Sequence, residues 1–267
     1  MLVAGVDAGS SVIKVAIMAG GALVATVVKP IKGRVAAQAE QALEEAVLNA
    51  GRSIEDLRYV VSSGVEKDDV RQANETATGL TCDAYGSLWV RPTARTVINV
   101  GAETCHAARF DRQGKLVDFA VTDKCATGTG IFLETVASMM EVSLADLAKM
   151  PADGADEVTI STMCAVFAES EVVTEVHRGT RKQDILRGVY NSVAYRASSL
   201  VRRVNPEPDV LMVGGVAQNG GVVAGLRAQL GLDIIVPDQP QLVGAIGAAI
   251  IAHHACLNQP LARGGAR

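Results

Sequence analysis

The chain has few aromatic residues, little net charge and no long apolar run. Phe, Trp and Tyr make up only 3% of its 267 residues, whereas glycine occurs 26 times, which suits a compact α/β protein with tight turns. A formal net charge of −4 with no basic cluster argues against nucleic-acid binding. Apolar runs such as residues 244–252 are far too short to span a bilayer, so we expect no membrane association.

Cysteine is also sparse. The five cysteines are irregularly spaced and do not form the framework of a disulfide-stapled secreted domain. No basic region precedes the first apolar run, and Asp7 interrupts that run, so we do not expect a signal peptide. A cytoplasmic protein with reduced thiols is therefore the expectation.

The same pattern of strand, glycine turn, strand, turn and strand occurs twice, near residues 2–28 and 96–121. This repetition predicts a duplicated α/β lobe. We expect residues 1–93 to form the N-terminal lobe and residues 94–267 the C-terminal lobe. The last predicted helix, over 242–254, is a candidate to pack back on the first lobe.

The first chemical motif is Asp7-Ala8-Gly9-Ser10-Ser11, between two predicted strands. A glycine in such a turn lets backbone N–H groups converge on an anion, and the serine hydroxyls add donors. A carboxylate at the end of the first strand can hold a hydrated Mg²⁺ that bridges phosphates. A plain hairpin with a small, polar turn is an equally good interpretation of this motif alone.

The second motif is an apolar strand over 209–213 that runs into Gly214 and Gly215 and then a predicted helix. Paired glycines permit the close approach of a ribose or base to the backbone. A strand-to-helix connection that needs positive φ is the simpler alternative. Together with the first motif and with Asn99-Val100-Gly101, the spacing matches a nucleotide cleft between two lobes.

Two cysteines, Cys125 and Cys164, lie 39 positions apart, and each opens a stretch that is predicted to be helical. Two thiolates are too few for an ordinary iron–sulfur cluster, which takes four. A two-fold or pseudo-two-fold dimer would supply the other two. The alternative is that both are small buried hydrophobic residues. Glu169 and Glu171 follow Cys164, but the sequence assigns them no role. The other cysteines have no partner at metal-ligand spacing and are expected to be structural: Cys82, Cys105 and Cys256.

The order of these motifs is similar to that of the actin/Hsp70/hexokinase superfamily of ATPases, which implies a two-lobed α/β fold with a duplicated βββαβα lobe. Residues 123–130, 164–172 and 214–219 resemble more closely the activators of 2-hydroxyacyl-CoA dehydratases and the ATPase subunits of benzoyl-CoA reductase. This similarity extends over nearly the whole chain, from Asp7 to about Ala252.

The resemblance implies that each subunit gives two cysteines, here Cys125 and Cys164, to one 4Fe-4S cluster at a dimer interface. ATP binding and hydrolysis then drive an electron from the cluster to catalytic iron–sulfur subunits, and a ferredoxin-like protein is the electron donor. It also implies a site for ATP or ADP with Mg²⁺. The candidate residues of that site are Asp7, Gly9, Ser10, Ser11, Lys14, Asn99, Gly101, Ala102, Gly214, Gly215, Val216 and Asn219.

The second phosphate loop departs from the family pattern. It usually reads Asp-Ile-Gly-Gly-Gln-Asp, whereas residues 99–104 of this chain read Asn-Val-Gly-Ala-Glu-Thr. Asn99 cannot carry the charge that orients an attacking water or holds Mg²⁺ through its water shell. We therefore expect weaker hydrolysis in this subunit and a heterodimer with a paralogous ATPase subunit whose loop is intact.

The Gly-Ala-Glu sequence of this loop favours an ATPase subunit of an ATP-dependent CoA-thioester reductase of the benzoyl-CoA reductase type, which acts on an aromatic CoA thioester. A homodimeric activator of a 2-hydroxyacyl-CoA dehydratase is the alternative. A sugar or acyl kinase of the same superfamily is the alternative from another class. A kinase needs a catalytic Asp as the base for the acceptor hydroxyl, and Asn at position 99 argues against the kinase alternative.

Overall fold

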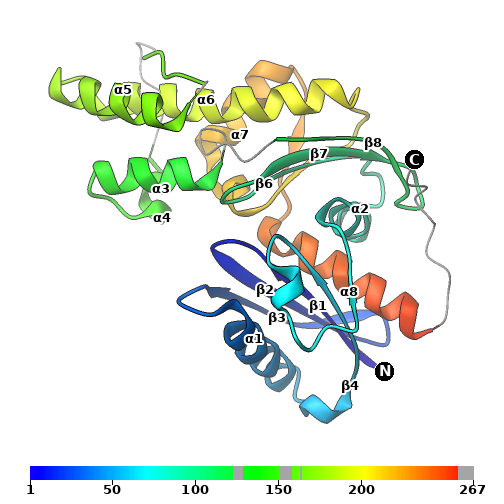
Figure 1. Ribbon diagram of the computed structural model, residues 1–267. Coiled ribbons are helices and arrows are strands. Elements are labelled where there is room, and N and C mark those ends of the chain that lie inside the picture. Colours follow the sequence, from blue (N-terminus) through cyan, green and yellow to red (C-terminus); the bar gives the residue numbers. More distant parts are fainter. Residues whose placement is uncertain (123–128, 151–157, 163, 258–267) are drawn as a thin grey trace. The chain divides into compact units, whose positions relative to one another are not determined.

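The computed structural model (Figure 1) describes residues 1–122, 129–150, 158–162 and 164–257. Their contacts group them into two compact units. The first unit contains residues 1–97, 109–118 and those described from 241 onward, and the second contains the rest. The last helix therefore belongs to the first unit. The lobe boundary predicted at residue 93 stays a prediction.

The first sheet has five strands in the order β3-β2-β1-β4-β5. Its first three strands form the predicted antiparallel meander, and β1 also pairs in parallel with β4. Gly20 and Gly21 make the β2–β3 turn with φ of 59° and 87°, a region that favours glycine. The strands are β1 (Leu2–Ala8), β2 (Val12–Ala19), β3 (Ala22–Pro30), β4 (Leu57–Ser63) and β5 (Glu75–Thr76).

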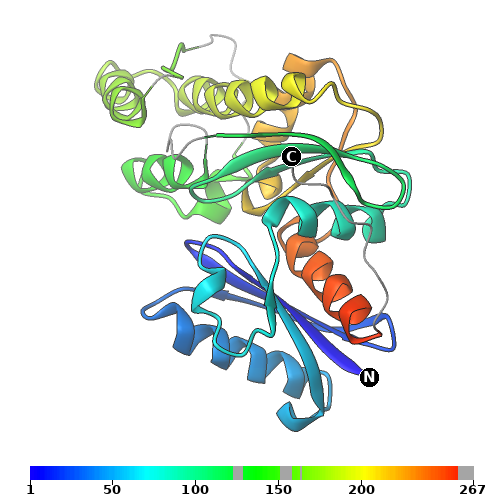
Figure 2. The same cartoon turned by 45° about the vertical axis from the view of Figure 1, so that its right-hand side comes forward.

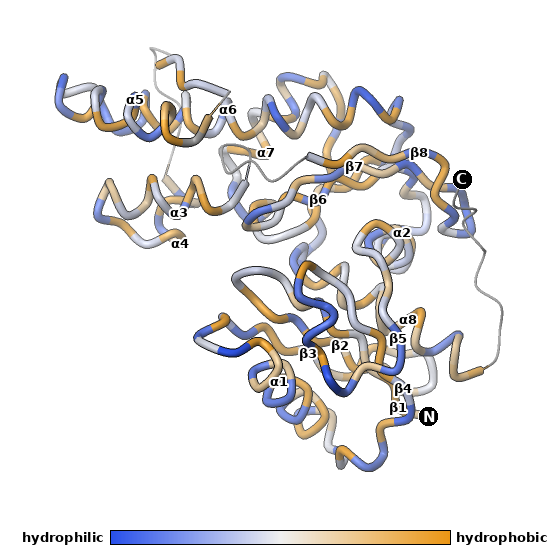
Figure 3. Tube along the Cα trace, viewed as in Figure 1, coloured by the Kyte–Doolittle hydropathy of each residue, from blue (hydrophilic) through white to orange (hydrophobic). Residues whose placement is uncertain are grey.

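Strand β1 is buried on both faces of the sheet. Successive side chains of a strand point to opposite faces, so alternate residues of β1 join different cores. Leu2 and Ala4 join a core with helix α1 (Val35–Asn49). Figure 3 shows that α1 carries both hydrophobic and hydrophilic residues, as expected for a helix with one buried face. Val3 joins a separate core with helix α8 (Val243–Cys256).

Helix α8 packs directly against both β1 and helix α2 (Gly79–Val90), and Figure 2 shows α2 and α8 side by side. Glycine makes this approach possible. A Cβ on Gly247 would overlap the carbonyl oxygen of Cys82, and a Cβ on Gly5 would overlap the carbonyl oxygen of Ala245. The backbone of α8 therefore lies in direct contact with that of α2 and with that of β1.

The second sheet has the order β10-β9-β6-β7-β8, and β9 and β10 are parallel. Its consecutive strands β6, β7 and β8 occupy the same positions as β1, β2 and β3 in the first sheet, so the predicted duplication is confirmed. The strands are β6 (Thr96–Val100), β7 (Cys105–Phe110), β8 (Leu116–Val121), β9 (Val210–Val213) and β10 (Ile234–Ile235).

The helices of the second unit surround one large hydrophobic core. The α-helices are α3 (Gly130–Met139), α4 (Leu144–Leu147), α5 (Ala165–His177), α6 (Lys182–Arg203) and α7 (Gly220–Leu230). Short 3₁₀ turns of the described chain are η1 (Ile54–Asp56), η2 (Lys67–Asp69), η4 (Gly215–Gln218) and η5 (Pro240–Leu242). Among the helices that the structure describes, none is both long and apolar enough to cross a membrane.

Replacing Gly247 with Ala should destabilise the first unit by about 1–3 kcal/mol, because the new methyl group would overlap the Cys82 carbonyl oxygen. Gly220→Ala is the matched control, since no atom lies within 4 Å of a Cβ at that position. We expect its stability to stay within about 1 kcal/mol of the parent. Urea unfolding measures both changes, and equal stability of the two variants would contradict the packing argument.

Candidate nucleotide-binding and cysteine sites

The β1–β2 hairpin brings Asp7 and Lys14 together. These residues are cross-strand partners, and Lys14 Nζ lies 3.1 Å from Asp7 Oδ2. The side chains of Lys14 and Asp7 are only 16% and 18% exposed, respectively. The Lys14 ammonium group therefore compensates the negative charge of the largely buried Asp7 carboxylate. The Gly9 N–H donates to the carbonyl oxygen of Val12 at 3.1 Å, which closes the turn. A Mg²⁺ ion bound here would share Asp7 with Lys14.

A second carboxylate, Asp83 of α2, lies near Asp7 and was missed by the sequence reasoning. A Cβ on Gly244, in the first turn of α8, would lie 3.2 Å from Asp83 Oδ1 and 3.5 Å from Asp7 Oδ2. Asp83 is buried. The one sequence signal was that Asp83 is the single acid in a segment of small and apolar residues. A charged side chain is rarely buried in such a segment unless it has a partner there.

In the second unit, the turn after β9 lies against the end of β6. A Cβ on Gly214 would overlap Asn99 Oδ1 and lie 2.6 Å from the carbonyl oxygen of Val100. Gly214 also has a φ of 88°, which an L-residue rarely adopts. The structure thus brings together two residues, Asn99 and Gly214, that the sequence placed in separate loops of one nucleotide site.

The first turn of helix α3 is hydrogen-bonded to carbonyl groups of the loop that follows β6. The Gly130 N–H donates to the Gly101 carbonyl oxygen at 2.8 Å, and the Ile131 N–H donates to that of Ala102 at 2.9 Å. These two donors belong to the first turn of α3, where N–H groups have no partner within the helix. The predicted second phosphate loop is therefore bonded directly to α3.

Asn219 caps helix α7, because its Oδ1 accepts a hydrogen bond from the Val222 N–H at 3.0 Å. The 3₁₀ turn η4, which begins at Gly215, lies between β9 and α7, whereas the sequence predicted a helix directly after the glycines. Val216 is buried, but Gly215 faces open space, with no atom within 4 Å of a Cβ built on it. The contact of these residues with adenosine stays a prediction.

Cys164 is the N-cap residue of α5, and its half-buried side chain makes no capping hydrogen bond. The N–H groups of the first turn and the helix dipole attract a negatively charged group to such a position, so Cys164 fits a cluster ligand. Cys125 lies outside the described residues. Within the described ranges, no three His, Cys, Asp or Glu side chains gather as metal ligands.

Two other cysteines differ from Cys164 in their surroundings. Cys82 and Cys105 are completely buried. Burial raises the pKa of the Cys105 thiol to about 12. Burial also raises the pKa of the Cys82 thiol well above its usual range, and the charges of Asp83 and Asp7 raise it further. Both remain neutral thiols at neutral pH, which suits a packing role rather than metal ligation.

Two sheets with one strand order, each opening with an antiparallel meander, define the two-lobed actin-like ATPase fold. The chain belongs to the BadF/BadG/BcrA/BcrD ATPase family, which it matches over residues 4–252. It is similar to the activator of lactoyl-CoA dehydratase from Anaerotignum propionicum, with 38% identity over 96% of this chain and 98% of the relative.

The structure is also similar to that of the activator of 2-hydroxyisocaproyl-CoA dehydratase from Clostridium difficile, solved with bound ADPNP. The TM-score is 0.90 at 36% identity, over 97% of this chain and 96% of the other. One of the benzoyl-CoA reductase subunits from Thauera aromatica is 30% identical over 79% of this chain and 77% of its own length. These relatives favour the alternative expectation, a dehydratase activator, over the preferred one.

Gly214 and Gly215 form a matched pair for testing the predicted adenosine loop. Gly214→Ala should lower stability by about 1–3 kcal/mol, because it imposes a positive φ on alanine and overlaps Asn99. Gly215→Ala should leave the melting temperature unchanged but weaken ATP binding, since its methyl group would occupy open space beside the loop. Calorimetric titration with ATP measures the second effect. Unchanged ATP affinity in Gly215→Ala would show that Gly215 is not part of the nucleotide site.

Proposed function

We propose that this protein is an ATP-dependent activator of an enzyme of the 2-hydroxyacyl-CoA dehydratase type. It acts as an electron-transfer subunit that carries half of a shared 4Fe-4S cluster. The observation that carries the proposal is the 36–38% identity, over nearly the full length of both chains, to proteins named as activators of such dehydratases. The position of Cys164 at the start of α5 supports it.

In this proposal the three loops bind ATP. Asp7 holds Mg²⁺ through its carboxylate, and Lys14 keeps that carboxylate oriented. Backbone N–H groups and hydroxyls of the first loop bind phosphate, as do those of the second, while the glycine pair after β9 lies near adenosine. The residues are Gly9, Ser10, Ser11, Lys14, Asn99, Gly101, Ala102, Gly214, Gly215, Val216 and Asn219.

The cluster ligands are Cys125 and Cys164 from each of two identical chains. A bound cluster supplies one electron at low potential, delivered by a ferredoxin-like donor and passed to the catalytic iron–sulfur subunits. The chain's own contribution is to present Cys164 at the N-terminus of α5, where free N–H groups and the helix dipole favour negative charge.

A second candidate is an ATPase subunit of a benzoyl-CoA reductase, paired with a paralogous subunit. The Gly101-Ala102-Glu103 sequence and Asn99 in place of the usual Asp favour it. Mass spectrometry of the chains that co-purify anaerobically separates the two candidates. A homodimer bound to dehydratase components supports the first, and a heterodimer of two ATPase chains bound to reductase components supports the second.

Anaerobically purified protein should contain about two iron atoms per chain, which is one 4Fe-4S cluster per dimer. Cys164→Ala should lose this iron and the EPR signal of the reduced cluster. Cys105→Ala should keep both, because the Cys105 thiol is buried and neutral. Iron that survives in Cys164→Ala, or a complete cluster in a monomer, would overturn the proposed arrangement.

Asn99→Asp should raise the rate of ATP hydrolysis about tenfold or more, because it supplies the charge that orients the attacking water. The two side chains have nearly the same shape, so the contact with Gly214 is retained. Asp7→Asn should abolish hydrolysis in both backgrounds. Steady-state phosphate release measures the rates, and an unchanged rate in Asn99→Asp would show that residue 99 does not limit hydrolysis.

A further inference from the structure

The backbone just before Cys164 is held by two charged side chains from different helices. The Ser161 N–H donates to Glu171 Oε2 of α5 at 2.6 Å. Arg196 of α6 donates through Nη2 to the carbonyl oxygen of Thr162. We propose that Glu171 and Arg196 are positioning residues that fix Cys164 for cluster ligation. This inference rests on the proposed function, because it takes Cys164 to be an iron ligand.

Glu171 is well placed for this role because it lies seven residues after Cys164. Seven residues of an α-helix turn through about 700°, so both residues lie on nearly the same face, about 10 Å apart along the axis. Ser161 lies only three residues before Cys164, so the hydrogen bond to Glu171 holds the backbone close to the cysteine.

Packing holds α5 mainly beyond its first turn. Ala168 and Val172 are completely buried, but Val166 and Phe167, next to Cys164 in sequence, are each 64% exposed. Among the described residues of the chain, the start of α5 therefore makes few apolar contacts that could fix it. Hydrogen bonds from charged side chains to backbone groups are about twice as strong as neutral ones, so Glu171 and Arg196 supply the constraint that packing does not.

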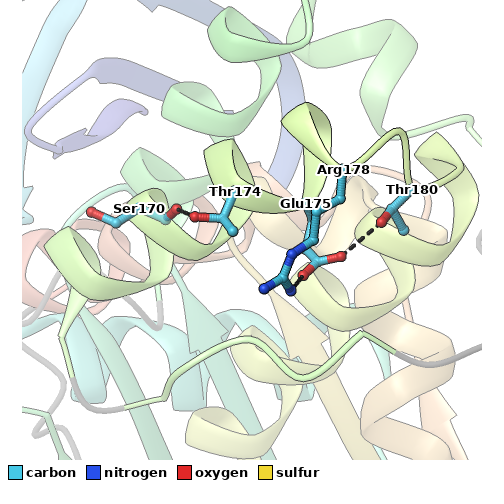
Figure 4. Close-up of polar contacts among 5 residues, drawn as sticks. All are labelled: Ser170, Thr174, Glu175, Arg178 and Thr180. Carbon is cyan, nitrogen blue, oxygen red and sulfur yellow. Dashed lines mark hydrogen bonds and ion pairs between the residues drawn. The ribbon is translucent and has the colours of Figure 1, made fainter.

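The control residue is Glu175, one turn further along the same helix. Figure 4 shows that its carboxylate bonds to Arg178 and Thr180, at the C-terminal end of α5. Ser170 and Thr174, on the same helix, donate to backbone carbonyls one turn earlier. Glu175→Ala thus removes an acid of α5 and two hydrogen bonds, but leaves the contacts of Ser161 and Thr162 unchanged.

The full chain and its variants are reconstituted anaerobically with ferrous iron and sulfide. Iron release to a chelator is then followed by visible absorption, and the reduced protein is recorded by EPR. Glu171→Ala should release iron about 10–100-fold faster than the parent, the usual effect of removing a residue that orients a metal ligand. Glu171→Gln should release iron more slowly than Glu171→Ala, because its amide oxygen accepts the same hydrogen bond, although without the charge that strengthens it. Glu175→Ala should match the parent.

Glu171→Asp provides a second test if Glu171→Ala does not fold. Its carboxylate is one methylene shorter, so it withdraws from the Ser161 N–H and should also speed iron release. Parent-like release and EPR spectra in folded Glu171→Ala or Glu171→Asp would overturn the inference, as would a Gln variant as defective as the Ala variant. A parent protein that binds no iron would instead overturn the proposed function.

Discussion

The start of helix α3 on the second predicted phosphate loop is the contact that links this loop to the helices of the second unit. Gly130 permits it, because a Cβ there would press to 3.2 Å against both the Ala102 Cα and the Gly101 carbonyl oxygen. Two backbone hydrogen bonds then tie α3 to the loop. A shift of this loop must move α3, whose first residue is five positions after Cys125. Such a link is what coupling between a nucleotide site and a cluster requires.

In the first unit, too, glycine residues allow backbone segments to approach closely. Asp7 and Asp83 lie near each other because α8 comes close to both β1 and α2, and Gly244 leaves room for both carboxylates in the first turn of α8. Lys14 compensates Asp7. Close backbone packing thus positions charged groups within a largely apolar core, where a misplaced side chain would be costly.

Sequence reasoning found both meanders, because alternating apolar residues and glycine turns are local signals. It did not delimit α2, since residues 82–87 are all buried and show no amphipathic pattern. Asp83 was missed for the same reason, and also because its surroundings are set by α8, which lies far along the chain. Local motifs singled out Asn99, Gly214 and Cys164 as candidates, but the contacts of Glu171 and Arg196 depend on tertiary structure.

The contrast among the described cysteines explains why only some thiols suit a cluster. Cys82 and Cys105 lie where desolvation favours the neutral thiol, so their packing excludes the thiolate that iron needs. Cys164 is half-buried at a helix N-terminus, where the N–H groups of the first turn and the helix dipole attract a negatively charged group. Packing does little to fix the orientation of a half-buried ligand such as Cys164. Polar contacts to the neighbouring backbone must then fix it, and Glu171 and Arg196 make such contacts with Ser161 and Thr162, just before Cys164.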